Sequence, residues 1–314
     1  MMAESTRCWV MTDGKPGMEN QCLGLAEALH LTPEVKRVAP RPPWRWLPPH
    51  FWFSALSAVE GLAPPWPDLL IATGRQTVAL ALAIKRRNPQ TFCVQIQDPV
   101  AGRGRFDLIA VPEHDALSGA NVIATLGALH RVTPQRLAAA APRFQPMLQP
   151  LPRPLVAVLL GGANKQYRLT EARARTLADG LARMPGGLAI TPSRRTGDDA
   201  MRIIRAALGG KPAVIWDGAG ENPYFGFLAH ADAIVVTGDS VSMVSEACST
   251  GKPVYVFDLE GGSRKFDRFH RALRDRGITR PFDGTLAEWR YPPLDDTARV
   301  ADEVRRRVAS FVRL

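Results

Sequence analysis

Short apolar runs alternate with helical segments along most of this chain. Within residues 231–262, the run 234–236 predicts a buried strand, a polar turn follows at 237–240, and 241–247 has the character of a helix. A second apolar run begins at Pro253. Strands that alternate with helices predict right-handed βαβ units and a parallel sheet. The predicted fold class is therefore α/β.

The remaining elements fall into two groups on either side of a proline-dense stretch. Further strands are expected within 7–13, 67–74, 91–99, 106–113, 154–162, 187–195 and 213–218, and helices within 18–30, 75–87, 170–184, 198–208, 223–231 and 295–314. Residues 142–154 contain five prolines, which oppose a helix or a central strand and predict an interdomain linker.

These groups predict two Rossmann-like domains that face a cleft, the GT-B-like arrangement. The N-terminal domain is expected over 1–145 and the C-terminal domain over 152–314. Residues 295–314 form an amphipathic helix with Val300 and Val304 on its apolar side, and we expect this helix to pack back on the N-terminal domain.

Composition excludes several classes of protein. With 46% hydrophobic and 22% charged residues, the chain resembles an ordinary soluble globular protein, and it lacks an apolar run of about 18 residues that could span a membrane. The four scattered cysteines predict reduced thiols and a cytoplasmic location. Glycine fingerprints for dinucleotides, P-loops and metal-binding motifs are missing, so neither a cofactor nor a metal is expected.

The net charge of +10 suits nucleic acid, anionic lipid or a phosphorylated small molecule, although an arginine-rich composition alone would also explain it. Because the basic residues are dispersed and no recognition helix is evident, we expect no nucleic-acid partner.

Two polar segments follow strands expected in the C-terminal half. Gly161 and Gly162 allow a phosphate to approach backbone N–H groups, or they simply form a turn. Ser193 and Arg194 offer a hydroxyl and a guanidinium to a diphosphate, or they belong to a solvated loop.

The turn at 237–240 and the helix after it carry more polar residues than capping requires. Gly238, Asp239, Ser240 and Ser242 surround the first turn, and capping accounts for only one of these side chains. Glu246 lies four residues beyond Ser242, so the two share a helix face, and its carboxylate suits ribose hydroxyls. We interpret this segment as a ligand site.

Polar residues also follow strands of the N-terminal half. Asp13, Gly14 and Gly17 form a flexible loop after the first strand, and Asp98 ends a later one. Carboxyl ends of parallel strands share one edge of a sheet, so we expect a lined cleft there. Asp13 and Asp98 are the candidate general bases, by position only.

Four segments together resemble a known family. They are "TDGKPGMENQCLGLAEAL", "QIQDP", "LLGGANKQYRL" and "TGDSVSMVSEACSTGKPVYVF", which are similar to the mitochondrial-fission ELM family of plants and bacteria. The second half is similar in turn to GT-B glycosyltransferases of the MurG-like group. That resemblance implies a ribose contact for Glu246, diphosphate-side contacts for Ser240 and Ser242, and a sugar-nucleotide contact for the loop at Gly161.

The resemblance implies a nucleotide sugar, UDP-linked or similar, as the ligand and metal-independent glycosyl transfer as the reaction. The alternative is a non-catalytic binding or scaffold protein that retains the fold.

Residues 41–66 hold four of the seven tryptophans, interspersed with prolines and arginines. This composition is typical of a membrane-interface contact, but aromatic residues also fill domain cores. MurG-like enzymes are thought to reach a lipid acceptor through their N-terminal domain, so the resemblance implies peripheral contact with the inner face of a membrane.

Overall fold

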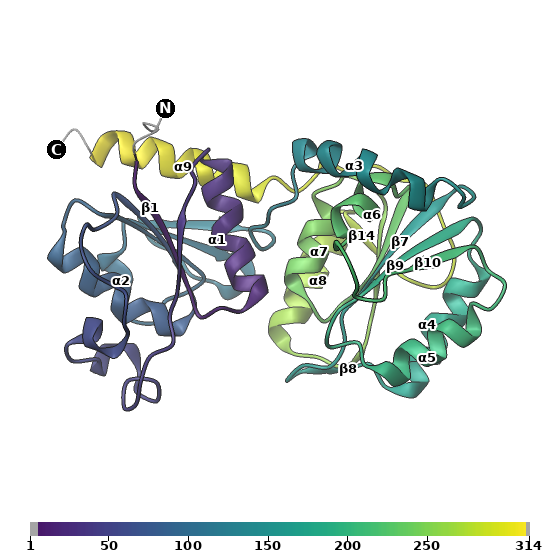
Figure 1. The fold of residues 1–314 in the computed structure, drawn as a ribbon, viewed down its shortest axis with the longest axis horizontal. Helices are drawn as coiled ribbons and strands as arrows, with labels where there is room; N and C mark the ends of the chain where they lie inside the picture. The colour runs from purple at the N-terminus through teal and green to yellow at the C-terminus, as the bar shows by residue number, and fades with distance from the viewer. Residues whose placement is uncertain (1–5, 312–314) are drawn as a thin grey trace. The chain divides into compact units, whose positions relative to one another are not determined.

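A computed structural model describes residues 6–311 and divides the chain into two compact units. The first unit contains the described residues up to Arg131 together with those from Asp295 onward, and the second unit is Val132–Leu294. Each unit has its own six-stranded sheet, so the α/β prediction of two sheets is confirmed (Figure 1).

The sheet of the first unit is parallel throughout. Its order is β2 (Glu34–Arg37), β1 (Cys8–Thr12), β3 (Leu69–Thr73), β4 (Phe92–Ile96), β5 (Leu108–Pro112) and β6 (Val122–Thr125). Its helices are α1 (Pro16–Ala28), α2 (Arg75–Arg87), α9 (Asp296–Phe311), and the 3-10 turns η1 (Pro49–Phe51), η2 (Ala55–Ala58), η3 (Arg103–Arg105) and η4 (Glu113–Asp115).

The alternation of side chains along these strands gives the first sheet two apolar faces. On one face, α1 and α9 lie side by side over Val10 and Ile71, and Val300 and Val304 of α9 are fully buried there (Figure 1). On the other face, α2 and parts of the segment 41–66 cover Trp9, Met11 and Leu70. Strands buried on both faces explain why the sequence shows continuous apolar runs.

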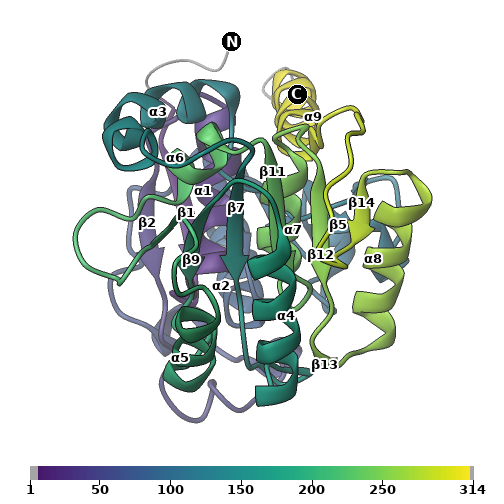
Figure 2. The same ribbon diagram turned by 90° about the vertical axis from the view of Figure 1, so that its right-hand side faces the viewer.

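The second sheet has the same parallel character. Its order is β10 (Ala213–Ile215), β9 (Gly187–Pro192), β7 (Leu155–Leu160), β11 (Ala233–Thr237), β12 (Val254–Phe257) and β14 (Thr279–Pro281) (Figure 2). A small antiparallel ribbon pairs β8 (Tyr167–Arg168) with β13 (Glu260–Gly261). The helices are α3 (Pro134–Leu148), α4 (Glu171–Arg183), α5 (Asp198–Ala207), α6 (Tyr224–His230), α7 (Val241–Cys248) and α8 (Arg264–Asp275).

The prediction that residues 142–154 exclude a helix is wrong. Helix α3 extends to Leu148 and contains Pro142 and Pro146, both of which face solvent and lack only their own N–H donors. Packing compensates for this loss, because Phe144 is buried against α6 at Gly226, where an added Cβ would lie 2.4 Å from the ring. The division between units therefore falls before α3 rather than within this stretch.

Hydrogen bonds join the first residues of α9 to residues 127–130, where the N-terminal part of the first unit ends. Asp296 is 3% exposed, accepts a hydrogen bond from the Gly127 N–H at 2.8 Å and pairs with Arg299 at 2.7 Å. The Thr297 hydroxyl accepts a hydrogen bond from the His130 N–H at 3.1 Å. These hydrogen bonds connect the two parts of the first unit next to the places where the chain leaves that unit, after Arg131, and returns to it, at Asp295.

We expect Asp296→Ala to lower the free energy of unfolding by about 2–4 kcal/mol, because it removes a buried charged acceptor and leaves a buried N–H unpaired. Asp302→Ala is the matched control: Asp302 pairs with Arg305 at the same i,i+3 spacing on α9, but its side chain is 76% exposed, so a loss below about 0.5 kcal/mol is expected. Urea titration of both variants measures the difference, and equal losses would contradict the assignment.

Candidate functional site

The order of the second sheet reverses between β7 and β11. From β7 the chain passes through α4 to β9 on one side, whereas from β11 it passes through α7 to β12 on the other. The loops that follow β7 and β11 therefore diverge, which makes the carboxyl edge between them the usual ligand position in such sheets. The structure brings the predicted residues Gly161, Gly162 and 238–240 together at this point.

The carboxylate of Asp239 occupies the centre of this edge. Asp239 is 2% exposed, and its oxygens accept hydrogen bonds from the Thr237 hydroxyl at 2.7 Å and the Gly162 N–H at 3.1 Å. Arg195 approaches the same carboxylate with Nη1 at 2.7 Å. The side chain predicted to touch a ligand is therefore engaged with the loops after β7 and β9.

Gly161 and Gly162 serve close packing around this carboxylate. A Cβ on Gly161 would lie 2.1 Å from Asp239 Oδ1, and one on Gly162 would lie 1.9 Å from the Arg195 carbonyl oxygen. The Gly161 N–H donates to the Thr237 hydroxyl at 2.7 Å, so both glycine amides have protein acceptors. This geometry explains why both positions need glycine, whereas phosphate contact stays a prediction.

Gly238 is buried behind the edge. Its carbonyl oxygen accepts a hydrogen bond from His270 Nε2 at 2.7 Å, which fixes the proton on that nitrogen. The Nδ1 atom of His270 has no hydrogen-bond partner among residues 6–311, and burial lowers the pKa of the ring, so the imidazole is neutral. Gly238 and His270 support the turn from behind.

The first turn of α7 presents partly exposed polar groups at the edge. Ser240 is the N-cap residue, and its oxygen accepts from the Met243 N–H at 3.3 Å, which leaves the hydroxyl proton free to donate outward. Ser242 is partly exposed. The unpaired N–H groups and positive end of the helix add to this donor set. Such a turn suits an anionic ligand.

Glu246 lies in the second turn of α7 and is partly buried. Its Oε2 accepts a hydrogen bond from the Tyr224 hydroxyl at 2.5 Å. Burial raises the pKa of Glu246 to about 7, and the Tyr224 hydrogen bond only partly opposes this shift. Oε1 stays available as an acceptor, since no second hydrogen bond to this carboxylate is found within residues 6–311.

Ser193 and Arg194 lie at the end of β9, beside an open cavity of about 450 Å³. Ser193 is tied into its own turn, because its hydroxyl oxygen accepts from the Arg195 N–H at 3.1 Å. Arg194 is exposed, and Trp216 from the end of β10 lines the same cavity. This pair places a cation next to an aromatic surface.

Three predicted residues of the first unit, Asp13, Gly14 and Gly17, follow β1, which lies at this unit's own reversal point between β1 and β3. Asp13 follows β1, forms an ion pair with Lys15, and lies 3.9 Å from the position of a Cβ on Gly74. Gly14 has φ of 79° and donates its N–H to the Thr12 hydroxyl at 2.8 Å. Gly17 is not in a loop as predicted, because Pro16 starts α1 one residue earlier.

Asp98 is engaged in structure. Both its oxygens accept hydrogen bonds from Arg103, at 2.8 and 2.7 Å, and it also accepts from the Val100 N–H at 2.9 Å. This arrangement holds the loop between β4 and β5 and weakens the position-based argument for Asp98 as a base.

The sequence analysis missed Thr237, Arg195, Tyr224 and His270, which complete the edge. Thr237 and Arg195 adjoin predicted residues, and for Thr237 a polar residue at the last position of an apolar strand was an available signal. Tyr224 and His270 come from α6 and α8, and no local pattern connects them with α7. Within residues 6–311, no group of three or more His, Cys, Asp or Glu side chains has the arrangement of a metal site.

Comparison with known proteins identifies the family. The family model described as "Mitochondrial fission ELM1" matches residues 16–308. The mitochondrial fission protein ELM1 of Arabidopsis thaliana is 34% identical, over 97% of this chain and 91% of its own. The chain belongs to the ELM1 family. A Rickettsia prowazekii protein is 28% identical to this ELM1-family chain, over 95% of it and 97% of the relative.

Solved structures similar to this ELM1-family protein have the GT-B fold. MurG of Acinetobacter baumannii gives a TM-score of 0.51 at 13% identity, over 98% of this chain and 93% of the other. The UDP-GlcNAc 2-epimerase of Methanocaldococcus jannaschii gives 0.51 at 10% identity, over 96% and 99%. At these identities the likeness establishes the fold alone, and it confirms the predicted GT-B-like class.

We expect Glu246 to make stability depend on pH. Because the folded state raises its pKa from 4.5 to about 7, folded protein binds the proton more tightly, and stability should fall by up to about 3 kcal/mol as pH rises from 4.5 to 7. Glu246→Gln should lack this part of the decline. Urea titrations at pH 5, 6, 7 and 8 measure it.

Glu288→Gln is the control, since Glu288 is exposed in the same unit and should keep the wild-type pH dependence. Parallel pH profiles for wild type and Glu246→Gln would show that Glu246 ionises normally.

Proposed function

We propose that this ELM1-family protein binds a nucleotide sugar at the carboxyl edge of its second sheet. The observation that carries the proposal is the convergence of Ser240, Ser242 and Glu246 on one helix that starts at the β7–β11 reversal point. Fold neighbours add support: the Methanocaldococcus jannaschii epimerase was crystallised with UDP-GlcNAc and UDP, and Staphylococcus aureus MnaA with UDP.

Each group of the edge has a proposed role. The diphosphate lies over the first turn of α7, where Ser240, Ser242 and the helix N-terminus donate hydrogen bonds. Glu246 accepts from the ribose through Oε1, while Tyr224 holds Oε2. Arg194 and Trp216 line the cavity, where the nucleobase stacks on the Trp216 ring in this proposal. Asp239 keeps Gly161 and Gly162 in place, and its negative charge disfavours a phosphate at these two glycines.

The proposed reaction is glycosyl transfer without a metal. The bond between the anomeric carbon and the diphosphate oxygen breaks as an acceptor oxygen bonds to that carbon, and the acceptor proton passes to a base. The electron pair leaves with the nucleoside diphosphate, whose charge the α7 donors stabilise. Asp13 is the better candidate for the general base, because both carboxylate oxygens of Asp98 already accept hydrogen bonds from Arg103.

A second candidate function is nucleotide-sugar binding without turnover. Two observations favour it: the buried Asp239 carboxylate occupies the anion position between the β7 and β11 loops, and both candidate bases are paired with cations. Binding of a nucleotide sugar without release of nucleoside diphosphate would support this function over catalysis.

We expect one of four nucleotides to raise the melting temperature of the wild-type protein. The four are the diphosphates UDP, GDP and ADP and the monophosphate CMP. At about 100 times its Kd the stabilisation should be about 2.7 kcal/mol. Glu246→Ala should weaken this binding by about 1.5–3 kcal/mol, because a charged hydrogen bond to the ribose is lost. Thermal-shift titration and calorimetry measure both effects.

The matched control is Glu288→Ala, which removes the same charge at an exposed position of the second unit and should bind as wild type does. Circular dichroism checks that Glu246→Ala is folded. The proposal fails if no nucleotide or nucleotide sugar binds, or if the two variants bind equally.

We further propose peripheral membrane contact through the segment 41–66. Trp46, Phe51 and Phe53 are 72%, 61% and 62% exposed, whereas Trp52 is buried, so the segment divides between core and surface. Exposed aromatics next to Arg41 and Arg45 suit a headgroup layer. No helix within residues 6–311 has the length and apolarity to cross a bilayer.

For this contact we expect co-sedimentation with anionic liposomes that weakens at high salt and falls several-fold in Trp46→Ala/Phe53→Ala. Arg175→Ala, an exposed change in the second unit, is the control. Equal sedimentation of all three proteins, or none, would leave these aromatics as ordinary surface.

A further inference from the structure

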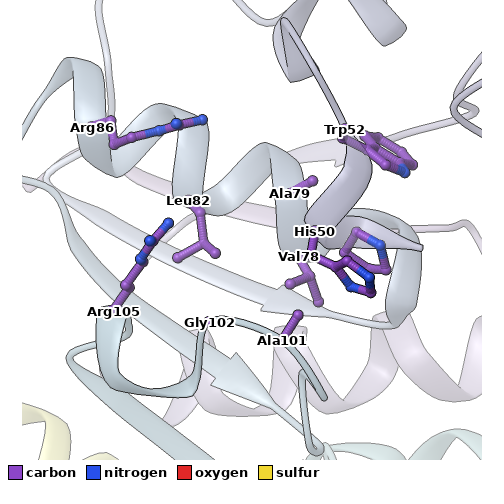
Figure 3. Close-up of a pocket in the computed structure, with 10 residues that line it drawn as sticks. His50, Trp52, Val78, Ala79, Leu82, Arg86, Ala101, Gly102 and Arg105 are labelled. Atoms are coloured by element: carbon purple, nitrogen blue, oxygen red, sulfur yellow. The ribbon is translucent and has the colours of Figure 1, made fainter. Parts of the chain in front are cut away.

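A cavity of about 280 Å³ lies along the flank of α2 in the first unit (Figure 3). Val78, Ala79 and Leu82 of α2 form its apolar floor. Trp52 closes it on one side, and the loop between β4 and β5 closes it on another through Ala101. None of these residues belongs to the nucleotide site proposed above, and the inference that follows does not rest on that site.

The cavity is held open by contacts of its own walls. Trp52 is 8% exposed and donates its indole N–H to the Leu47 carbonyl at 3.1 Å, which fixes the plane of the ring. Gly102 has φ of 66°, which favours glycine, and a Cβ there would lie 2.6 Å from Leu82 Cδ1, so a side chain at this position would require Leu82 to shift. The walls are therefore built before any ligand arrives.

Two arginines define one end of the cavity. Figure 3 shows Arg86, from the last turn of α2, and Arg105, from η3, extending toward the same end, with His50 at the other. Within residues 6–311 neither guanidinium has a hydrogen-bond or ion-pair partner. In contrast, Arg103 of the same turn is neutralised by Asp98, and Lys85 of the same helix by Asp107.

The charge at this end favours an anion. The C-terminus of α2 contributes roughly half a negative charge, which two full positive charges outweigh. Arginine forks bind carboxylate or phosphate in bidentate fashion. Apart from His50 at the other end, the rest of the lining is apolar, so the ligand must also bring an apolar body.

The position of the cavity separates it from the edge where Asp13 lies. Helix α2 starts at the carboxyl end of β3 and runs back toward the amino ends of the strands, and Arg86 is in its last turn. A ligand with its anionic group at Arg86 therefore lies along the side of the unit. The cavity is also concave and narrow, which suits one chain rather than a flat lipid surface.

We propose that this cavity binds a single amphipathic anion, namely an aliphatic chain that carries one carboxylate or phosphate group. The anionic group pairs with Arg86 and Arg105, and the chain lies on Leu82 and Ala79 against the Trp52 ring.

Calorimetry with the full chain tests this, using decanoate and decyl phosphate below their critical micelle concentrations. Both should bind, and decyltrimethylammonium should not. Arg86→Gln and Arg105→Gln should each weaken binding about five- to tenfold. Ala101→Leu, which fills the cavity without changing charge, should weaken it similarly.

Arg87→Gln is the matched control, because Arg87 is the exposed neighbour of Arg86 on α2 and does not line the cavity. A change below twofold is expected. The proposal is overturned if neither anion binds, if the cationic chain binds as well, or if Arg86→Gln and Arg87→Gln behave alike. Binding of anionic vesicles that needs Arg86, without binding of either free anion, would also overturn it in favour of a membrane surface.

Discussion

The buried carboxylate of Asp239 connects the parts of the second unit that matter most for a ligand. A carboxylate this far from water is tolerated only when hydrogen bonds and a cation replace its hydration. Thr237, Gly162 and Arg195 supply those partners from the ends of three adjacent strands, β11, β7 and β9. The two glycines after β7 follow from the same constraint, because any side chain there would collide with this network.

In the proposed nucleotide site, this arrangement favours the first turn of α7 as the position of the diphosphate. In many parallel sheets the first glycine-rich loop offers its N–H groups to phosphate. Here those groups already donate to protein atoms, and a negative charge is present between the loops. The donors that remain available are at the start of α7, after β11: the hydroxyls of Ser240 and Ser242 and the N–H groups of the first turn. The partly buried Glu246, with its raised pKa, lies one turn further in.

The first unit uses the same strand reversal for a different surface. Asp13 and Gly74 face each other at its edge, as Asp239 and Gly161 do in the second unit, but Asp13 pairs with an exposed lysine. Two arginines without a partner within residues 6–311, Arg86 and Arg105, lie instead on its flank. The two units therefore offer distinct chemistry: hydroxyl and amide donors at the edge of one, and an apolar cavity with one cationic end in the other.

Periodicity and composition determined much of this fold. Continuous apolar runs identified β1, β3, β7 and β11 because strands buried on both faces need no polar alternation, and α2 was predicted over its observed range. Such patterns did not predict the edge strand β2 of the first sheet. The edge strand β2 reads "EVKR" and is half-exposed, so nothing apolar distinguishes it from a loop. Helix α3 forms despite its prolines because packing on Gly226 outweighs local propensity.

The sequence by itself determined which polar residues follow which strands, since strand ends are local features. Only the tertiary structure decided their roles. Whether Asp239 meets a ligand or pairs with an arginine of another loop depends on three loops far apart in the chain. Likewise, Tyr224 of α6 reaches Glu246, and His270 of α8 reaches Gly238, only because the tertiary fold brings these distant segments together. Hydrogen bonds between distant segments depend on how helices pack on a sheet, and no local pattern records that packing.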